Sequence, residues 1–242
     1  MNNILIPTQF ESDTIDAIKT AIKYAESKSC TIVLTTVTDV PGSIYSPSFF
    51  LRTAVPEMTE AQHELLQECK SIVAATKNCQ LKVHHQFGIS APLIKNLLEH
   101  FSVGLVILTQ SYKSNTNRTQ RHLLQLVSNC KCPILHMGYN KEERDFNKAL
   151  YLEHTQTKIG IQDLQKIVSE KFSFKIVSQA SVFEEQKPED ITPYLSETIS
   201  KNNIDLLVET RKPEKNRLKK RTDSHVNEVL GLPVLSLYEE RV

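Results

Sequence analysis

Short apolar runs alternate along most of the chain with segments whose apolar residues recur at helical spacing. The run at residues 3–7 predicts a first strand, and it is followed by Ile15, Ile18, Ile22 and Ala25. Ser12 or Asp13 can cap that helix. The β-branched run at 31–40 predicts a second strand. Strands that alternate with helices in this way indicate a parallel sheet covered on both faces.

The rest of the first half continues the alternation. Residues 57–77 predict a long helix with apolar positions at Met58, Ala61, Leu65, Cys69, Ile72 and Thr76. A third strand at 81–87 ends at Gly88, and Ser90 can cap the next helix. The apolar face of that helix is expected to consist of Leu93, Leu97 and Phe101.

The second half of the chain repeats the closing strands of the first half. The runs VGLVILT at 103–109 and KCPILHM at 131–137 are matched by IDLLVET at 204–210 and GLPVLSL at 231–237. Each pair predicts a fourth and a fifth strand, and each fourth strand follows an amphipathic helix. A β-α-β unit has therefore been duplicated.

The second copy is shorter than the first. It contains strands at 147–153 and 174–183, a helix with Ile161, Leu164, Val168 and Phe172, and a helix with Pro193 near its start. No counterpart of the long helix and the third strand is predicted. We expect two doubly wound parallel-sheet α/β domains, five-stranded at 1–139 and truncated to four strands at 146–242, joined by a charged linker.

Composition indicates which classes of protein to set aside. No stretch approaches the roughly 20 apolar residues that cross a bilayer, and the start resembles no signal peptide, so we expect a cytoplasmic protein without a membrane partner. The 29 basic and 28 acidic residues create no global field toward nucleic acid. The five cysteines, all within the first copy at 1–139, predict reduced thiols because their number is odd.

Neither a metal site nor a catalytic site is expected. Cys130 and Cys132 have no second Cys or His pair at ligand spacing, and His84 and His85 are adjacent on a strand. The chain contains no nucleophile elbow, Walker loop or dinucleotide fingerprint. Scattered candidates are Asp39, Ser111, Ser114, His122 and His136. A hydrolase or transferase of the nucleotide type is the alternative, which turnover of a nucleotide, ester or phosphoester would favour.

Several of these segments resemble the universal stress protein family. They are ILIPT at the start, Gly88 after the third strand, the helix into LVIL, and CPIL at the end of the first half. The duplicated chain resembles the tandem members of the family. The resemblance implies an adenine nucleotide alpha hydrolase-like sheet in the order 3-2-1-4-5 and a role in stress response or signalling. It also implies ATP binding in some members and none in others.

The ligand crevice of a doubly wound sheet lies beyond the carboxyl ends of its strands where the strand order reverses. The candidate ligand-binding residues are Pro7, Thr8, Gln9, Thr109, Gln110, Ser111, Lys113, Arg118 and Arg121. ATP-binding relatives resemble this chain at Pro7 but carry Asp in place of Gln9. They also carry glycines where this chain has Thr109, Tyr112 and residues 120–122.

Loss of those glycines bears directly on nucleotide binding. Side chains in their place block the approach of phosphate to backbone N–H groups, so we expect no cofactor. ATP or another adenine nucleotide is the alternative. It would use Lys113, Arg118 and Arg121 as phosphate ligands, with Asn115 and Asn117 in left-handed turns.

The second copy differs further from ATP-binding relatives. Glu153 at the end of its first strand disfavours a nucleotide. Its fourth-strand loop is a basic patch of Arg211, Lys212, Lys215, Arg217, Lys219, Lys220 and Arg221. Because no aromatic residues are interleaved for base stacking, we expect no nucleic-acid partner. Binding of an acidic partner or nucleic acid through residues 211–221 is a further alternative.

The partner predictions follow from the duplication. We expect the two domains to pair within the chain through their fifth strands, side by side and antiparallel. The apolar segment from Ile44 to Val55 is a candidate surface for a homodimer or an unknown protein partner. The sequence therefore predicts a degenerate tandem universal stress protein that acts as a non-catalytic stress or signalling binding module.

Overall fold

The computed structural model describes residues 3–25, 28–39, 57–139, 146–153, 160–181, 188–211 and 230–239. The chain separates into two compact units, residues 1–132 and 133–242. The segment from Ile44 to Val55 and the basic residues from Lys212 to Arg221 lie outside the described residues. No helix in the described part of the chain has both the length and the apolar character to cross a membrane.

The described residues of unit 1 form four parallel strands. They are β1 (Asn3–Pro7), β2 (Cys30–Thr38), β3 (Cys79–Phe87) and β4 (Val103–Leu108), in the order β3-β2-β1-β4. β1 pairs with β2 on one side and with β4 on the other, with Leu5 opposite Val33 and Val106. Strand β1 is therefore central, and the strand order reverses between β1 and β4.

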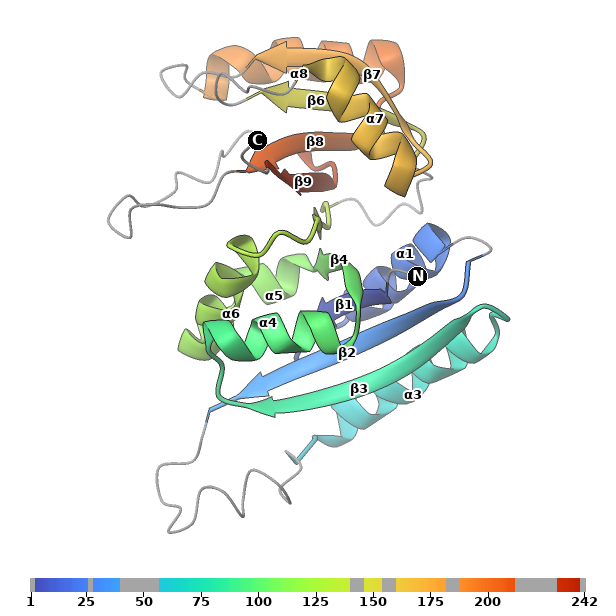
Figure 1. Cartoon of the computed structure of the whole chain (residues 1–242), viewed down its shortest axis with the longest axis vertical. Helices are drawn as coiled ribbons and strands as arrows, with labels where there is room; N and C mark the ends of the chain where they lie inside the picture. The colour runs from blue at the N-terminus through green and yellow to red at the C-terminus, as the bar shows by residue number, and fades with distance from the viewer. Residues whose placement is uncertain are drawn as a thin grey trace. The chain divides into compact units, whose positions relative to one another are not determined.

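The helices of unit 1 cover both faces of this sheet (Figure 1). They are α1 (Thr14–Ala25), α3 (Glu60–Ala74), α4 (Ala91–His100), α5 (Gln110–Ser114) and α6 (Arg118–Ser128). α1 packs beside α3, and α4 packs beside α6. α3 begins at a capping box in which Thr59 and Gln62 each bond the backbone of the other. This order confirms the predicted doubly wound arrangement.

Two predicted helix faces differ from the structure. In α3 the buried residues are Leu66, Cys69 and Val73, whereas Ala61 of the predicted face is exposed. In α4 Ile94 is the buried residue, and Leu93 is 42% exposed. Both helices carry apolar residues on neighbouring positions of the helical wheel. Sequence alone therefore locates the apolar stripe but not its centre.

Five strands occur among the described residues of unit 2. They are β5 (Ile134–His136), β6 (Lys148–Glu153), β7 (Lys175–Ser181), β8 (Leu206–Arg211) and β9 (Val234–Tyr238), in the order β5-β9-β8-β6-β7. β6 pairs in parallel with β7 and β8, and β8 pairs in parallel with β9. β5 pairs with β9 in the antiparallel direction, with Leu135 opposite Leu235.

The second copy is truncated, as predicted. Its helices are α7 (Ile161–Lys171) and α8 (Pro188–Asn202), and only residues 182–187 separate β7 from α8. Six residues leave no room for a helix and a strand like α3 and β3. Pro193 lies inside α8 and not near its start, because the helix begins at Pro188.

Loss of the third strand changes the surroundings of β7. Among the described strands β7 is the last in its sheet, and its residues alternate between exposed and partly buried. Val177, on the more exposed face, is 46% exposed. The opposite face of the sheet packs against α8, where Ile191 and Leu195 join a core with Leu150. One face of β7 is thus covered by α8, and the residues on the other face are exposed.

Candidate functional site

The carboxyl ends of β1 and β4 place six of the candidate ligand residues at one edge of unit 1. β1 ends at Pro7 and is followed by Thr8 and Gln9, while β4 ends at Leu108 and is followed by residues 109–111. Thr8 and Thr109 are completely buried. The hydroxyl of Thr8 accepts the Phe10 N–H at 2.6 Å and lies 2.8 Å from the hydroxyl of Thr14. This is the edge at which the sequence analysis expected a ligand crevice.

Two carboxylates of the chain itself occupy this crevice. Glu11 Oε2 accepts the backbone N–H of Gln9 at 2.9 Å and the hydroxyl of Thr8 at 3.3 Å. Asp13 Oδ2 accepts the backbone N–H of Ser111 at 2.8 Å. The sequence prediction treated Asp13 only as a helix cap and did not consider Glu11. Two acidic residues directly after the first strand were the signal that could have identified them.

At the start of α5, the backbone N–H groups of Ser111, Tyr112 and Lys113 all form hydrogen bonds within the chain, so none of them is available to a ligand. The N–H of Ser111 bonds Asp13, that of Tyr112 bonds Thr109 Oγ1 at 3.2 Å, and that of Lys113 bonds the Thr109 carbonyl at 3.2 Å. Tyr112, where the family resemblance would place a glycine, is completely buried. Burial raises the pKa of its phenol, and the charge of Glu11 raises it further.

Gln9 forms hydrogen bonds to neighbouring elements through both its side chain and its backbone. Its side-chain Nε2 donates to the carbonyl of Val37 at 3.1 Å, and its backbone carbonyl accepts from Gln62 Nε2 at 3.0 Å. Gln9 therefore links β1 to β2 and α3. The next residue, Phe10, has a φ of 62° and is 7% exposed. The crevice loop thus keeps a strained turn that holds an aromatic ring in the core.

The predicted basic phosphate ligands lie on α5 and α6. Lys113 is half-buried, whereas Arg118 and Arg121 are exposed. Asn115 and Asn117, for which the ATP-binding alternative allowed left-handed turns, both have negative φ. Each side chain instead accepts a backbone N–H two residues ahead: Asn115 bonds the N–H of Asn117, and Asn117 bonds that of Thr119. The asparagines therefore turn the chain and cap α6 without a left-handed residue.

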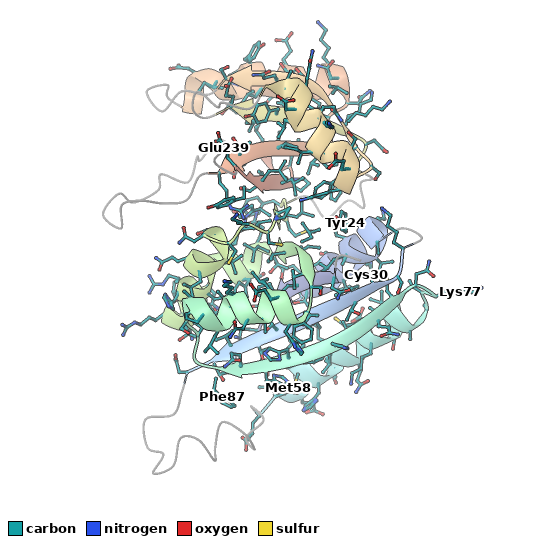
Figure 2. All side chains as sticks on the ribbon, viewed as in Figure 1. Tyr24, Cys30, Met58, Lys77, Phe87 and Glu239 are labelled. Atoms are coloured by element: carbon teal, nitrogen blue, oxygen red, sulfur yellow. The ribbon has the colours of Figure 1, made fainter. Side chains whose placement is uncertain are left out.

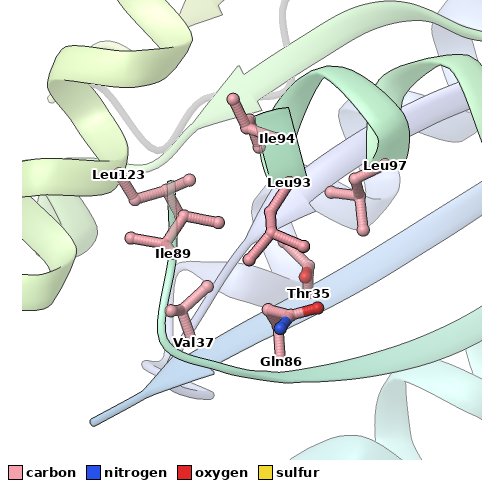
Figure 3. A pocket seen from close by; sticks show the side chains of 8 residues that line it. All are labelled: Thr35, Val37, Gln86, Ile89, Leu93, Ile94, Leu97 and Leu123. Atoms are coloured by element: carbon pink, nitrogen blue, oxygen red, sulfur yellow. The ribbon is translucent and has the colours of Figure 1, made fainter. Parts of the chain in front are cut away.

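A small cavity lies between the sheet and the helices α4 and α6 (Figure 3). Its lining residues are Thr35, Val37, Gln86, Ile89, Leu93, Ile94, Leu97 and Leu123. Its volume is about 10 Å³, close to the minimum for one water molecule. The cavity is mainly apolar and too small for a purine base.

In the second copy, the corresponding polar residues also bond within the chain. Glu153 at the end of β6 accepts from Gln179 Nε2 at 3.0 Å and from Ser181 Oγ at 3.2 Å. Arg211, predicted as the first residue of a surface patch, is the last residue of β8 and is only 2% exposed. Its guanidinium donates to the Ser236 carbonyl at 2.6 Å and lies 5.7 Å from the Tyr238 ring centre.

Arg211 is thus excluded from the surface patch by its pairing. β8 extends one residue beyond its predicted end, because Arg211 pairs with Tyr238 in β9. Glu239, labelled in Figure 2, directly follows β9, is 7% exposed and donates its backbone N–H to the Arg211 carbonyl at 2.9 Å. The sequence analysis assigned Arg211 to the surface because it is charged. In the structure, its tertiary contacts bury it.

The histidines and cysteines that were considered as metal ligands lie apart in the described structure. His84 packs edge-on against Phe101 with ring centres 5.6 Å apart, while Nδ1 of His85 lies 2.6 Å from Thr36 Oγ1. No group of three or more potential ligands occurs among the described residues. All five cysteines are free thiols, and burial raises the pKa of Cys30 and Cys69 to about 11.

Acid should destabilise unit 1 through His84 and His85. Burial lowers the pKa of both imidazoles below 6.5, and the charge of His100 adds to the effect at His84. The folded state then binds fewer protons than the unfolded chain, so this stability is full above pH 6.5 and is lost as the pH falls through the lowered pKa. Urea unfolding between about pH 5 and 8 measures this slope.

A matched pair of histidine variants identifies the source of the slope. His84→Gln should flatten the pH dependence, whereas His122→Gln, at an exposed position of α6, should leave it unchanged. Equal slopes in all three proteins would show that His84 does not contribute.

Comparison with solved structures places this fold among known proteins. No protein-family model and no curated protein matches the chain in sequence. A universal stress protein from Archaeoglobus fulgidus DSM 4304 is 12% identical, with a TM-score of 0.57 over 99% of each chain. A functionally unknown protein from Pseudomonas aeruginosa PAO1 is 14% identical, with a TM-score of 0.53 over 98% of this chain and 92% of its own. The chain therefore has the α/β fold of universal stress protein structures.

Proposed function

We propose that this protein is a non-catalytic binding module of the universal stress protein type whose first crevice takes no nucleotide. One observation carries the proposal: the carboxylate of Asp13 accepts the Ser111 N–H at the position where a phosphate oxygen would need it. The anion that relatives receive from a ligand is here supplied by the chain. A phosphate would have to displace Asp13 before it could bind.

Electrostatics support the same conclusion. Glu11 and Asp13 belong to one short loop, and each bonds only neutral donors. A phosphate charge about 4 Å from either carboxylate would be repelled by about 4 kcal/mol at an effective dielectric constant of about 20. The two carboxylates together would outweigh what the exposed Arg118 and Arg121 could return.

The non-catalytic part of the proposal rests on the bonds of the candidate residues. Asp39 accepts a hydrogen bond from the Thr119 hydroxyl, and the hydroxyl of Ser114 donates to the Ser111 carbonyl at 3.1 Å. Neither bond activates a nucleophile. The likeness of fold to the universal stress protein from Archaeoglobus fulgidus supports a role in stress response or signalling.

Thermal unfolding with ATP tests the proposal. The unfolding temperature of the intact protein should be the same with and without ATP, ADP and AMP, because a ligand at about 100 times its dissociation constant would add about 2.7 kcal/mol of stability. Arg118→Ala and Arg121→Ala provide matched controls for weak surface binding. A saturable stabilisation by ATP that both variants retain would contradict the closed crevice.

The predicted association of the two domains forms part of the same proposal. The antiparallel pairing of β5 with β9 supports an internal partnership of the fifth strands. Such a partnership would shield strand edges that could otherwise recruit a second chain. Replacement of Gly138, which follows β5 closely, tests this pairing.

A further inference from the structure

The strands β2 and β3 both begin with a cysteine, and the two cysteines occupy directly opposite positions. Cys30 and Cys79 are register partners in the parallel pairing of these strands, which start at the same end of the sheet (Figure 1). The backbone N–H of Cys30 donates to the Asn78 carbonyl at 2.9 Å, which fixes the register at this end. Because register partners on neighbouring parallel strands project to the same face of a sheet, the two thiols share one face.

The same strand pair shows that register partners on this face can reach each other with their side chains. Thr36 and His85 are partners further along the two strands, and Thr36 Oγ1 lies 2.6 Å from His85 Nδ1. An even number of residues separates this pair from Cys30 and Cys79 on each strand. Both pairs therefore lie on the same face, on backbones with the same spacing.

A disulfide between Cys30 and Cys79 fits the spacing of the two backbones. Neighbouring strands lie about 4.8 Å apart, and disulfides join Cα atoms that are about 4.4–6.8 Å apart. The two Cβ atoms need a separation of about 3.5–4.5 Å, so the strand ends would have to approach slightly and the bond would be strained. A strained disulfide is reduced more easily than a relaxed one, which suits a reversible bond.

Both thiols are buried but lie one residue from the surface. Cys30 is 5% exposed and Cys79 is 9% exposed, whereas the residues before them, Ser29 and Asn78, are exposed. Burial, together with a smaller effect of the neighbouring Cys79, raises the pKa of Cys30 to about 11. Little Cys30 thiolate exists at neutral pH, so the pair stays reduced until a small, strong oxidant reaches it.

We propose that Cys30 and Cys79 form a reversible disulfide that locks β3, the outermost described strand of unit 1, to β2 when the protein meets hydrogen peroxide. The thiolate of one cysteine attacks the O–O bond and becomes a sulfenic acid, with release of one water molecule. The second thiol displaces the sulfenic hydroxyl as a second water molecule and closes the S–S bond. Two thiols and one hydrogen peroxide thus give one disulfide and two water molecules, and a dithiol reductant restores both thiols.

The bond would stabilise unit 1 against unfolding. It would close a loop of residues 30–79, which contains β2 and α3. A closed loop of this length restricts the unfolded chain more than the folded one. Oxidised protein should therefore need more urea to unfold than reduced protein.

Peptide mapping of the intact protein after treatment with hydrogen peroxide tests this bond. Trypsin should release residues 29–52 joined to residues 78–82, and dithiothreitol should separate them. The urea midpoint should rise on oxidation and return after reduction. Cys79→Ala should abolish both the linked peptides and the rise, whereas Cys69→Ala, which removes another buried thiol of unit 1, should retain both.

Mapping of the unsubstituted chain keeps the test valid if either variant fails to fold. Thiols that stay reduced, a bond from Cys79 to Cys69, or a disulfide confined to Cys130 and Cys132 would overturn the proposal. Oxidation of Cys30 to a sulfinic acid without any linked peptide would also overturn it. A linked pair that leaves the urea midpoint unchanged would show that the bond does not lock the two strands.

Discussion

Gly138→Ala should destabilise unit 2 by about 3 kcal/mol, at the upper end of the range for an overpacked interior. A Cβ on residue 138 would lie 2.4 Å from the Gly231 carbonyl oxygen and 2.8 Å from backbone atoms of Leu232 and Pro233. These neighbours are all main-chain atoms, so no side chain can rotate to make room. Relief requires the segment after β5 to separate from the segment before β9.

Urea unfolding of the intact protein measures this loss, and Gly160→Ala is its matched control. A Cβ at Gly160 would come no closer than 3.8 Å to Asp163 Oδ2, which is ordinary contact. Gly160 is a helix N-cap without a side-chain bond, so alanine there should cost about 1 kcal/mol or less. Equal losses in the two variants would argue against the close approach of the two backbone segments.

Arg211→Ala should also cost unit 2 about 3 kcal/mol. The truncation removes the donor of a 2.6 Å bond to the Ser236 carbonyl and leaves a void beside the Tyr238 ring. Ser236 is 1% exposed, so water cannot easily replace the lost donor. The unfolding midpoint in urea should fall without a change in its slope if the native fold is retained.

Arg118→Ala is the control for this second prediction, because it removes the same side chain from an exposed position. Its expected effect is within about 0.5 kcal/mol. If Arg211→Ala were equally mild, Arg211 would belong to the surface patch that the sequence predicted.

Strand order was the part of the fold that the sequence predicted best. The run at residues 3–7 is β1 with the same bounds, and Gly88 ends β3 with a φ of 64°. A short apolar run between two helical patterns is best interpreted as a buried strand, because a strand buried on both faces needs apolar residues throughout. The fold class and the missing helix and strand of the second copy could be read from the same pattern.

The chemistry of the crevice was less accessible to sequence reasoning. The hydrogen bond between Asp13 and Ser111 joins residues 98 positions apart, and no local sequence pattern predicts it. Tyr112 lies in a polar stretch but is completely buried, because Thr109 begins the short helix α5 there and turns the ring inward. Topology was enough to predict that the ends of β1 and β4 lie at one edge of the sheet. It could not determine which side chains meet at that edge.

The exposed face of β7 shows how the absence of a neighbouring helix and strand affects which residues a strand can carry. In unit 1, β2 lies between β1 and β3 and is buried along most of its length. Its counterpart β7 is the last of the described strands in its sheet, and Lys175, Gln179 and Ser181 lie on its exposed face. An ancestral deletion of the outer helix and strand would be tolerated only if polar residues replaced apolar ones at alternate positions. Val177, which is 46% exposed, is the apolar residue on that face of β7.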